Sequence, residues 1–358
     1  MTVGVKPDRK FIYKIIMNKT LINLKEISNA RNFIYGIAIL WIVFFHCGLR
    51  ITSNFWYMIK LRGDCGVEIF FFLSGCSLYF SYIKKPNALT FYKRRLLRTM
   101  PYYLIFYGIV FAYFNLIAKF NFGQFLLNYS MLDFWLHGLG NVPWFLAALL
   151  VFYALYPLIY LVFFGEHNHK WLYRAIFVTA VTVPCVVLSI YYLHLRIFLY
   201  RVPVFLLGCV AGKFVYEGRD LKFYHALIIF VCLIIGKILC NLFSHISVML
   251  HVYYLPLSLM TILILTQVYK FFTIYCNFVD KIFEYIGTIT LEIYLTHEKV
   301  QENVFRILNK IGLQVQFNNT IYQIACVVLA IGISIGLSML IKLIIKLCIK
   351  KKNQPQQT

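Results

Sequence analysis

Long apolar runs, separated by short basic or polar segments, make up most of this chain of 358 residues. Each run spans about 16 to 25 residues, which is the length an α-helix needs to cross the hydrocarbon core of a bilayer. The pattern predicts an all-α polytopic membrane protein with about ten transmembrane helices. We place them at residues 33–49, 65–83, 101–118, 143–164, 171–193, 197–215, 223–243, 252–269, 282–298 and 320–346.

Composition agrees with this pattern, since 61% of the residues are hydrophobic and only 13% are charged. A soluble domain of this length would not carry so much apolar surface. The net charge of +22 comes from lysines and arginines in the short segments between apolar runs. We therefore expect the lipid bilayer as the partner, and not nucleic acid. No metal site is predicted, because the ten cysteines are scattered and mostly lie inside apolar runs.

Lysine and arginine concentrate in alternate segments between the runs, which indicates a cytoplasmic location for both chain termini. Phe11, Ile12 and Ile15 alternate with lysines, as is typical of a basic amphipathic helix on the inner membrane face, here expected over 8–26. Three parts are predicted: a basic amphipathic N-terminal segment (1–31), a membrane domain (32–347) and a polar basic cytoplasmic tail (348–358).

The first apolar run contains a histidine, His46, near its far end. A histidine in hydrocarbon is costly, so by default it marks a functional site, and imidazole exchanges protons near neutral pH. The alternative is a structural histidine that forms hydrogen bonds between helices. Tyr35 lies eleven residues earlier, within about 20° of the same helix face.

The second run opens with Asp64 and Glu68, which are four residues apart and therefore lie on one helix face. A carboxylate buried in the membrane needs a partner, and His46 is expected at the same depth. We therefore predict a Glu68–His46 pair. Ser74 and Gly75 follow in the same run and are interpreted as a notch for close helix packing.

A basic cluster, comprising Lys93, Arg94, Arg95 and Arg98, precedes Pro101, where the third helix is predicted to begin. One interpretation is an anchor on the cytoplasmic side. The other is a phosphate site, because the guanidinium fork matches phosphate geometry.

The ninth run, EYIGTITLEIYLTHEKV, carries Glu292 in the middle of the membrane and His297 near its outer end. His297 and His46 are predicted at similar depth. We expect the two histidines to meet in one cavity.

Several sequence blocks occur in a recognisable order: a histidine that ends the first run, GVEIFFFLSG, FYKRRLLRTMP, VPWFLAALLVFYALYP, RVPVFLLG and LEIYLTH. Over nearly the whole chain this series resembles the acyltransferase family 3 membrane proteins. The resemblance implies a ten-span enzyme of a bacterial cytoplasmic membrane. It implies transfer of an acetyl or other short acyl group from acetyl-CoA or another acyl-CoA to a sugar hydroxyl of a surface polysaccharide or glycolipid.

The resemblance also implies roles for single residues. His46 would act as general base or transient acyl carrier, oriented by Glu68, with His297 facing the acceptor. Donor-binding candidates are Arg31, Tyr35, Lys93, Arg94, Arg95 and Arg98; acceptor or oxyanion candidates are Ser74, Trp144, Arg201 and Glu292. The family commonly has an arginine eleven residues before its histidine. Tyr35 stands there in this chain, and Arg31 is the nearest arginine.

Two other interpretations remain open. A transporter or flippase for a glycan or lipid also needs many membrane helices with polar residues inside them. A catalytically inactive relative serving in glycan assembly is the other, because Tyr35 replaces the usual arginine.

Overall fold

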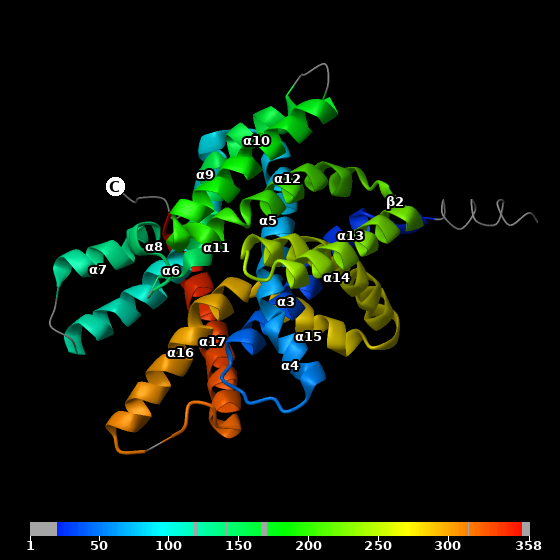
Figure 1. Cartoon of the computed structure of the whole chain (residues 1–358). Coiled ribbons are helices and arrows are strands. Elements are labelled where there is room, and N and C mark those ends of the chain that lie inside the picture. Colours follow the sequence, from blue (N-terminus) through cyan, green and yellow to red (C-terminus); the bar gives the residue numbers. More distant parts are fainter. Residues whose placement is uncertain (1–19, 118–120, 141, 166–169, 314, 353–358) are drawn as a thin grey trace, which may run out of the picture.

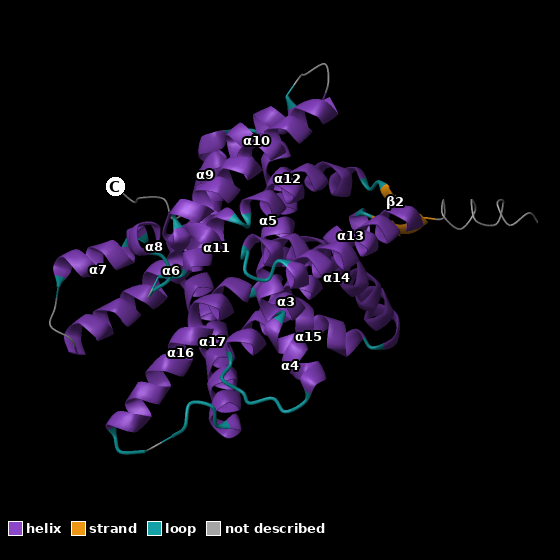
Figure 2. Cartoon of the chain, in the orientation of Figure 1, coloured by secondary structure: helices purple, strands orange, loops and turns teal. Residues whose placement is uncertain are grey.

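The computed structural model describes residues 20–117, 121–140, 142–165, 170–313 and 315–352, and helices make up most of this part of the chain (Figures 1 and 2). The helices are α2 (Lys25–Asn29), α3 (Arg31–His46), α4 (Asn54–Leu61), α5 (Gly66–Ile83), α6 (Ala88–Ile117), α7 (Phe122–Tyr129), α8 (Leu132–His137), α9 (Trp144–Phe164), α10 (Lys170–Tyr191), α11 (Arg196–Leu199), α12 (Val202–Glu217), α13 (Phe223–Leu242), α14 (Val248–Tyr275), α15 (Asn277–Thr288), α16 (Thr290–Lys310) and α17 (Thr320–Lys352), with 3₁₀ turns η1 (Gly63–Cys65) and η2 (Leu193–Leu195).

Seven helical segments of the described chain are long and apolar enough to cross a membrane, which confirms a helical polytopic membrane protein. They are Cys65–Ile83, Trp144–Phe164, Trp171–Tyr191, Leu193–Glu217, Phe223–Leu242, Val248–Tyr275 and Thr320–Ile344. Helix α3 is also apolar but has only 16 residues. The count of about ten spans and the cytoplasmic termini stay predictions.

The third helix was predicted to begin at Pro101, and this is wrong. Helix α6 begins at Ala88, and Pro101 lies inside it. A proline inside a helix removes one backbone hydrogen bond, and the turns before it still form. Arg95 and Arg98 therefore stand on a helix, and with Thr99 they share one face at the i, i+3, i+4 spacing.

The predicted ninth span, 282–298, is two helices rather than one. Helix α15 ends at Thr288, and α16 begins at Thr290. Three consecutive β-branched residues, Thr288 to Thr290, disfavour a continuous helix here because their side chains crowd the preceding turn. The break puts Glu292 in the first turn of α16, so the positive end of that helix dipole lies inside the bundle.

Glycines bring two helix pairs into backbone contact. A Cβ on Gly75 of α5 would lie 2.6 Å from the carbonyl oxygen of Phe205 in α12, and one on Gly208 of α12 would lie 2.2 Å from that of Phe72. The packing notch predicted at Gly75 is therefore present. In the same way, a Cβ on Gly287 of α15 would lie 1.8 Å from the carbonyl oxygen of Asn32 in α3.

The N-terminal segment is only partly helical where it is described. Residues 8–19 of the predicted amphipathic helix lie outside the described part. Thr20–Asn23 form strand β1, which pairs antiparallel with β2 (Asp220–Lys222), so that part of the prediction is wrong. Backbone pairing to β2 supplies hydrogen bonds that a local amphipathic pattern does not reveal. At the other end of the chain, α17 continues to Lys352, into the predicted tail.

Candidate active site

A cavity of about 160 Å³ lies between α3, α5, α6, α9 and α16. Three arginines line it: Arg31 from α3, and Arg95 and Arg98 from α6. No ion pair joins any of the three to a carboxylate in the described part of the chain. Glu292 at the start of α16 also lines the cavity, which leaves an excess of positive charge there.

Arg95 is the most deeply buried of these arginines, with 9% of its surface exposed. Its guanidinium lies over the rings of Phe91 and Tyr153, 5.6 Å from each centroid. Its buried Nε atom has no hydrogen-bond partner among the described residues. Burying a cation whose N–H has no acceptor costs free energy unless a ligand accepts that hydrogen bond and balances the charge. This position therefore suits an anion.

Further along the cavity, away from the arginines, the lining is apolar and aromatic. Tyr35 stacks on Phe70, with ring centroids 5.0 Å apart and planes within 9°. Ile42 and Tyr294 also line the cavity. From Arg31 to Ile42 helix α3 advances eleven residues, or about 16 Å. The cavity is therefore long, with a basic end and an apolar passage.

The cavity gathers some of the predicted donor residues and leaves others out. Arg31, Tyr35, Arg95 and Arg98 line it together. Lys93 and Arg94 do not: both are exposed, and Arg94 donates to the carbonyl of Ser81. Lys93 and Arg94 lie on the same helix but point away, because they precede Arg95 by two residues and one residue, or about 200° and 100° around the helix axis.

Two predicted acceptor residues, Ser74 and Glu292, line this same cavity and not a separate outer one. Ser74 follows Phe70 by four residues and therefore shares its face of α5. The break before α16 brings Glu292 to the cavity.

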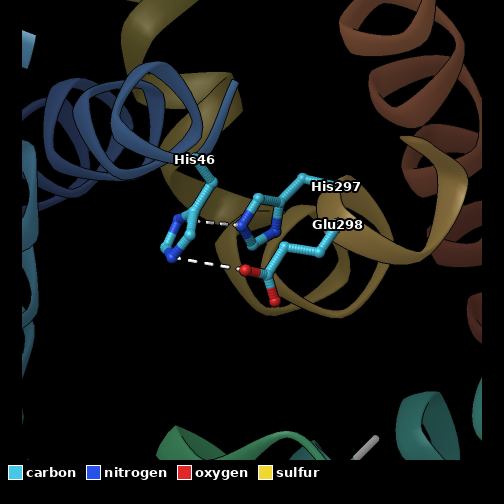
Figure 3. A group of neighbouring side chains, drawn as sticks. All are labelled: His46, His297 and Glu298. Carbon is cyan, nitrogen blue, oxygen red and sulfur yellow. Dashed lines mark hydrogen bonds and ion pairs between the residues drawn. The ribbon is translucent and has the colours of Figure 1, made fainter. Parts of the chain in front are cut away.

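The two predicted histidines do meet, as Figure 3 shows. His46 comes from the end of α3, and His297 and Glu298 come from one turn of α16. His297 Nε2 lies 3.4 Å from His46 Nδ1, and His46 Nε2 lies 3.3 Å from Glu298 Oε1. His297 is buried, whereas the side chains of His46 and Glu298 are 31% and 50% exposed.

Hydrogen-bond partners assign the protons on this pair. His297 Nδ1 lies 3.1 Å from the carbonyl oxygen of Ile293 and 2.9 Å from that of Tyr294, so Nδ1 carries the hydrogen and Nε2 the lone pair. His46 Nδ1 faces the Ile42 carbonyl at 3.0 Å as well as His297 Nε2, so it too must donate. The working nitrogen of His46 is therefore Nε2.

His46 Nε2 and the Glu298 carboxylate both offer lone pairs to the space between them. A proton transferred to His46 Nε2 would therefore lie beside a carboxylate that stabilises it. The three ligand atoms lie within 4.8 Å of one another, a spacing that a divalent cation also accepts. The direct hydrogen bond between the histidines uses a lone pair that a cation would need, and we interpret the group as a proton-transfer site.

The predicted Glu68–His46 pair is absent. Glu68 Oε1 instead lies 2.9 Å from His251 Nδ1 and 3.3 Å from Arg201 Nε, and only 2% of the residue is exposed. Val67 faces the cavity, so Glu68, one residue and about 100° further round α5, faces α12 and α14. Glu298 occupies the position beside His46 that was expected for Glu68.

Arg201, predicted as an acceptor residue, is the centre of a second buried network. Its Nη2 lies 2.7 Å from Asp64 Oδ2, and its Nη1 donates to the carbonyl of Ile197 at 3.0 Å. The guanidinium lies over the ring of Trp144, another predicted acceptor residue, 5.1 Å from its centroid. With 1% of its surface exposed, Arg201 has little room for a ligand.

Sequence reasoning missed Glu298, His251 and Tyr294. The signal for Glu298 was its position directly after His297, because two consecutive residues of a helix can both contact a side chain that lies beside that turn. His251 lies near the start of a long apolar helix, where its pairing with Glu68 depends on packing that no local pattern reveals.

The histidine pair lies directly beyond the apolar end of the cavity. The carbonyl that accepts from His46 belongs to Ile42, and one that accepts from His297 belongs to Tyr294, and both of these residues line the cavity. His46 follows Ile42 by one helical turn, or about 6 Å along the axis. A long ligand anchored at the arginines would therefore end next to the histidines.

Searches of curated proteins and of solved structures gave no match. The model of acyltransferase family 3, described as an acyltransferase domain, matches residues 32–339, which include the histidine pair and every cavity-lining residue except Arg31. The chain therefore belongs to acyltransferase family 3, and it is a multi-pass membrane acyltransferase.

Proposed function

We propose that this enzyme transfers an acetyl or other short acyl group from acyl-CoA to a sugar hydroxyl of a cell-surface polysaccharide or glycolipid, in a bacterial cytoplasmic membrane. The observation that carries the proposal is the shape of one cavity. Its basic end holds three arginines without ion pairs to any described residue, and its apolar end stops one helical turn from His46.

An acyl-CoA is complementary to the cavity along its length, because its anionic phosphates match the basic end and its uncharged arm matches the apolar passage. Its phosphates would be held by Arg31, Arg95 and Arg98, and Arg95 Nε, which has no partner among the described residues, supplies a donor for one of them. The N-terminus of α16, which also lines the cavity, favours negative charge nearby. The apolar passage would hold the uncharged arm that carries the thioester.

Acyl transfer then needs a base for the acceptor hydroxyl. His46 Nε2 takes the hydroxyl proton while the hydroxyl oxygen forms a bond to the thioester carbon. The carbonyl electron pair moves to oxygen, then returns and breaks the carbon–sulfur bond. The imidazolium of His46 gives its proton to the leaving sulfur, so the products are an ester and a free thiol. Glu298 stabilises the imidazolium in between.

The acceptor would approach from the side on which His46 and Glu298 are partly exposed. That a sugar hydroxyl arrives there rests on the resemblance to surface-glycan acyltransferases, and the open imidazole supplies the chemistry that any hydroxyl would need.

Binding of CoA to purified variants tests the donor site. We expect the double variant Arg95→Ala, Arg98→Ala to bind CoA about 10²- to 10⁴-fold more weakly, because each of the two lost charge-assisted hydrogen bonds is worth about 1.5–3 kcal/mol. The matched control is Lys93→Ala, Arg94→Ala, which removes the same charge from the same helix but outside the cavity. Equal losses in both variants, or none in the first, would leave the cluster as a membrane anchor only.

A further inference from the structure

Tyr294 stands between the donor cavity and the histidine pair. It lines the cavity, precedes His297 by three residues on α16, and its ring centroid lies 6.0 Å from that of His297. The other residues at this end of the cavity, Ile42, Val67 and Phe145, have apolar side chains. Tyr294 therefore carries the polar side chain closest to where the thioester would end.

The hydroxyl of Tyr294 has an unused hydrogen. Its oxygen accepts a hydrogen bond from the backbone N–H of Phe145 at 3.1 Å. No acceptor for the hydroxyl hydrogen is present among the described residues, although other cavity groups such as Ser77 donate to a backbone carbonyl. The hydrogen is therefore available to a ligand atom at the apolar end of the cavity.

The partner of this hydroxyl strengthens it as a donor. Phe145 is the second residue of α9, so its N–H is one of the amides that a helix leaves without a partner inside the helix. Accepting from that amide polarises the tyrosine O–H bond, and the positive end of the α9 dipole favours negative charge nearby. Both effects grow in value when the ligand oxygen becomes an anion.

The oxyanion candidates expected from the sequence are less suitable. Ser74 shares its helix face with the Tyr35–Phe70 stack and lies further toward the arginines. Arg201 is committed to Asp64, Glu68 and the carbonyl of Ile197.

We propose that the Tyr294 hydroxyl donates the hydrogen bond that stabilises the oxyanion during acyl transfer, an inference that rests on the proposed function. As the acceptor oxygen bonds to the thioester carbon, the carbonyl π pair moves to oxygen and receives the Tyr294 hydrogen bond. Tyr294 keeps its proton throughout. When the carbonyl re-forms, the sulfur leaves and receives the proton that His46 had taken from the acceptor.

The variant Tyr294→Phe removes this donor and keeps the ring. We expect its kcat to fall about 10²- to 10³-fold, the usual loss for one oxyanion donor, with KM for acetyl-CoA close to wild type. Affinity for the trifluoromethyl ketone analogue of acetyl-CoA, whose hydrate resembles the tetrahedral intermediate, should fall by a similar factor, while affinity for CoA itself should not.

The matched control is Tyr103→Phe, because the Tyr103 hydroxyl also makes backbone hydrogen bonds but lies outside the cavity. We expect its kcat to match the wild type. A Tyr294→Phe variant with wild-type kcat, or one that loses CoA and ketone affinity equally, would overturn the oxyanion role. If the wild-type protein itself transfers nothing from acetyl-CoA, the proposed donor is wrong, which is a different result.

Discussion

Two groups of histidine and carboxylate side chains differ in how deeply they are buried and in how many ionic partners they have. In the first, His46 and Glu298 are 31% and 50% exposed and face each other with free lone pairs. In the second, Glu68 and Arg201 are almost fully buried, and each is held by several partners.

The difference separates a group suited to proton transfer from a group that holds helices together. A buried ion network whose members are paired to one another holds helices in register, and removing one member leaves an uncompensated charge. A partly exposed imidazole with one nitrogen fixed by a backbone carbonyl and the other free is prepared for proton transfer. We therefore propose that acyl transfer takes place at the first group and that the second group joins α5, α12 and α14.

The largest expected effect comes from removing His46, and removing His251 of the second group provides the comparison. We expect His46→Ala to reduce the rate of O-acyl transfer to the proposed glycan acceptor by about 10²- to 10⁴-fold, because the general base is lost. His251→Ala removes one partner of Glu68 and should keep transfer per folded molecule close to wild type. Membrane insertion and thermal stability of both variants are measured alongside. Undiminished acylation by His46→Ala would end its catalytic role.

The second effect concerns stability. Arg201→Met would leave Asp64 and Glu68 without their shared cation and should cost about 3–5 kcal/mol of folding free energy. Thermal unfolding in detergent measures it. The matched control is Arg98→Met, because Arg98 is exposed and has no ion pair with a described residue, and its unfolding temperature should stay close to wild type. Similar losses in both variants would contradict the proposed division.

Apolar periodicity predicted most helices and the meeting of His46 with His297, because span length and depth follow from the bilayer alone. The basic cluster suggested Arg95 and Arg98 as anion ligands, the family resemblance added Arg31, and all three line one cavity. These inferences used the depth of a residue in its span, the local composition and the order of sequence blocks, all of which a sequence contains directly.

Predictions that needed the rotation of one helix against another were less successful. Depth alone paired Glu68 with His46, yet the close packing at Gly75 and Gly208 turns Glu68 toward Arg201. The start of the third helix was placed at Pro101 because proline suits a first turn, whereas packing of the preceding turns decides the true start. Tertiary contacts decide the rotation of a helix and its first residue, and the spacing of residues along one helix does not reveal those contacts.

The smallest expected effect compares the two carboxylates directly. Glu298→Gln keeps the size of the side chain but removes the charge that stabilises the His46 imidazolium. Because Glu298 is half exposed and solvent screens it, we expect kcat to fall only about tenfold, equivalent to about 1.4 kcal/mol, with little change in unfolding temperature. Glu68→Gln should do the reverse, lowering the unfolding temperature through its lost pairing with Arg201 and His251 while transfer per folded molecule stays near wild type. Measuring kcat and thermal unfolding for both variants gives four values. If Glu68→Gln lowered kcat more than Glu298→Gln did, the carboxylate that supports His46 would be the one predicted from the sequence, acting in an arrangement of α5 different from the one described here.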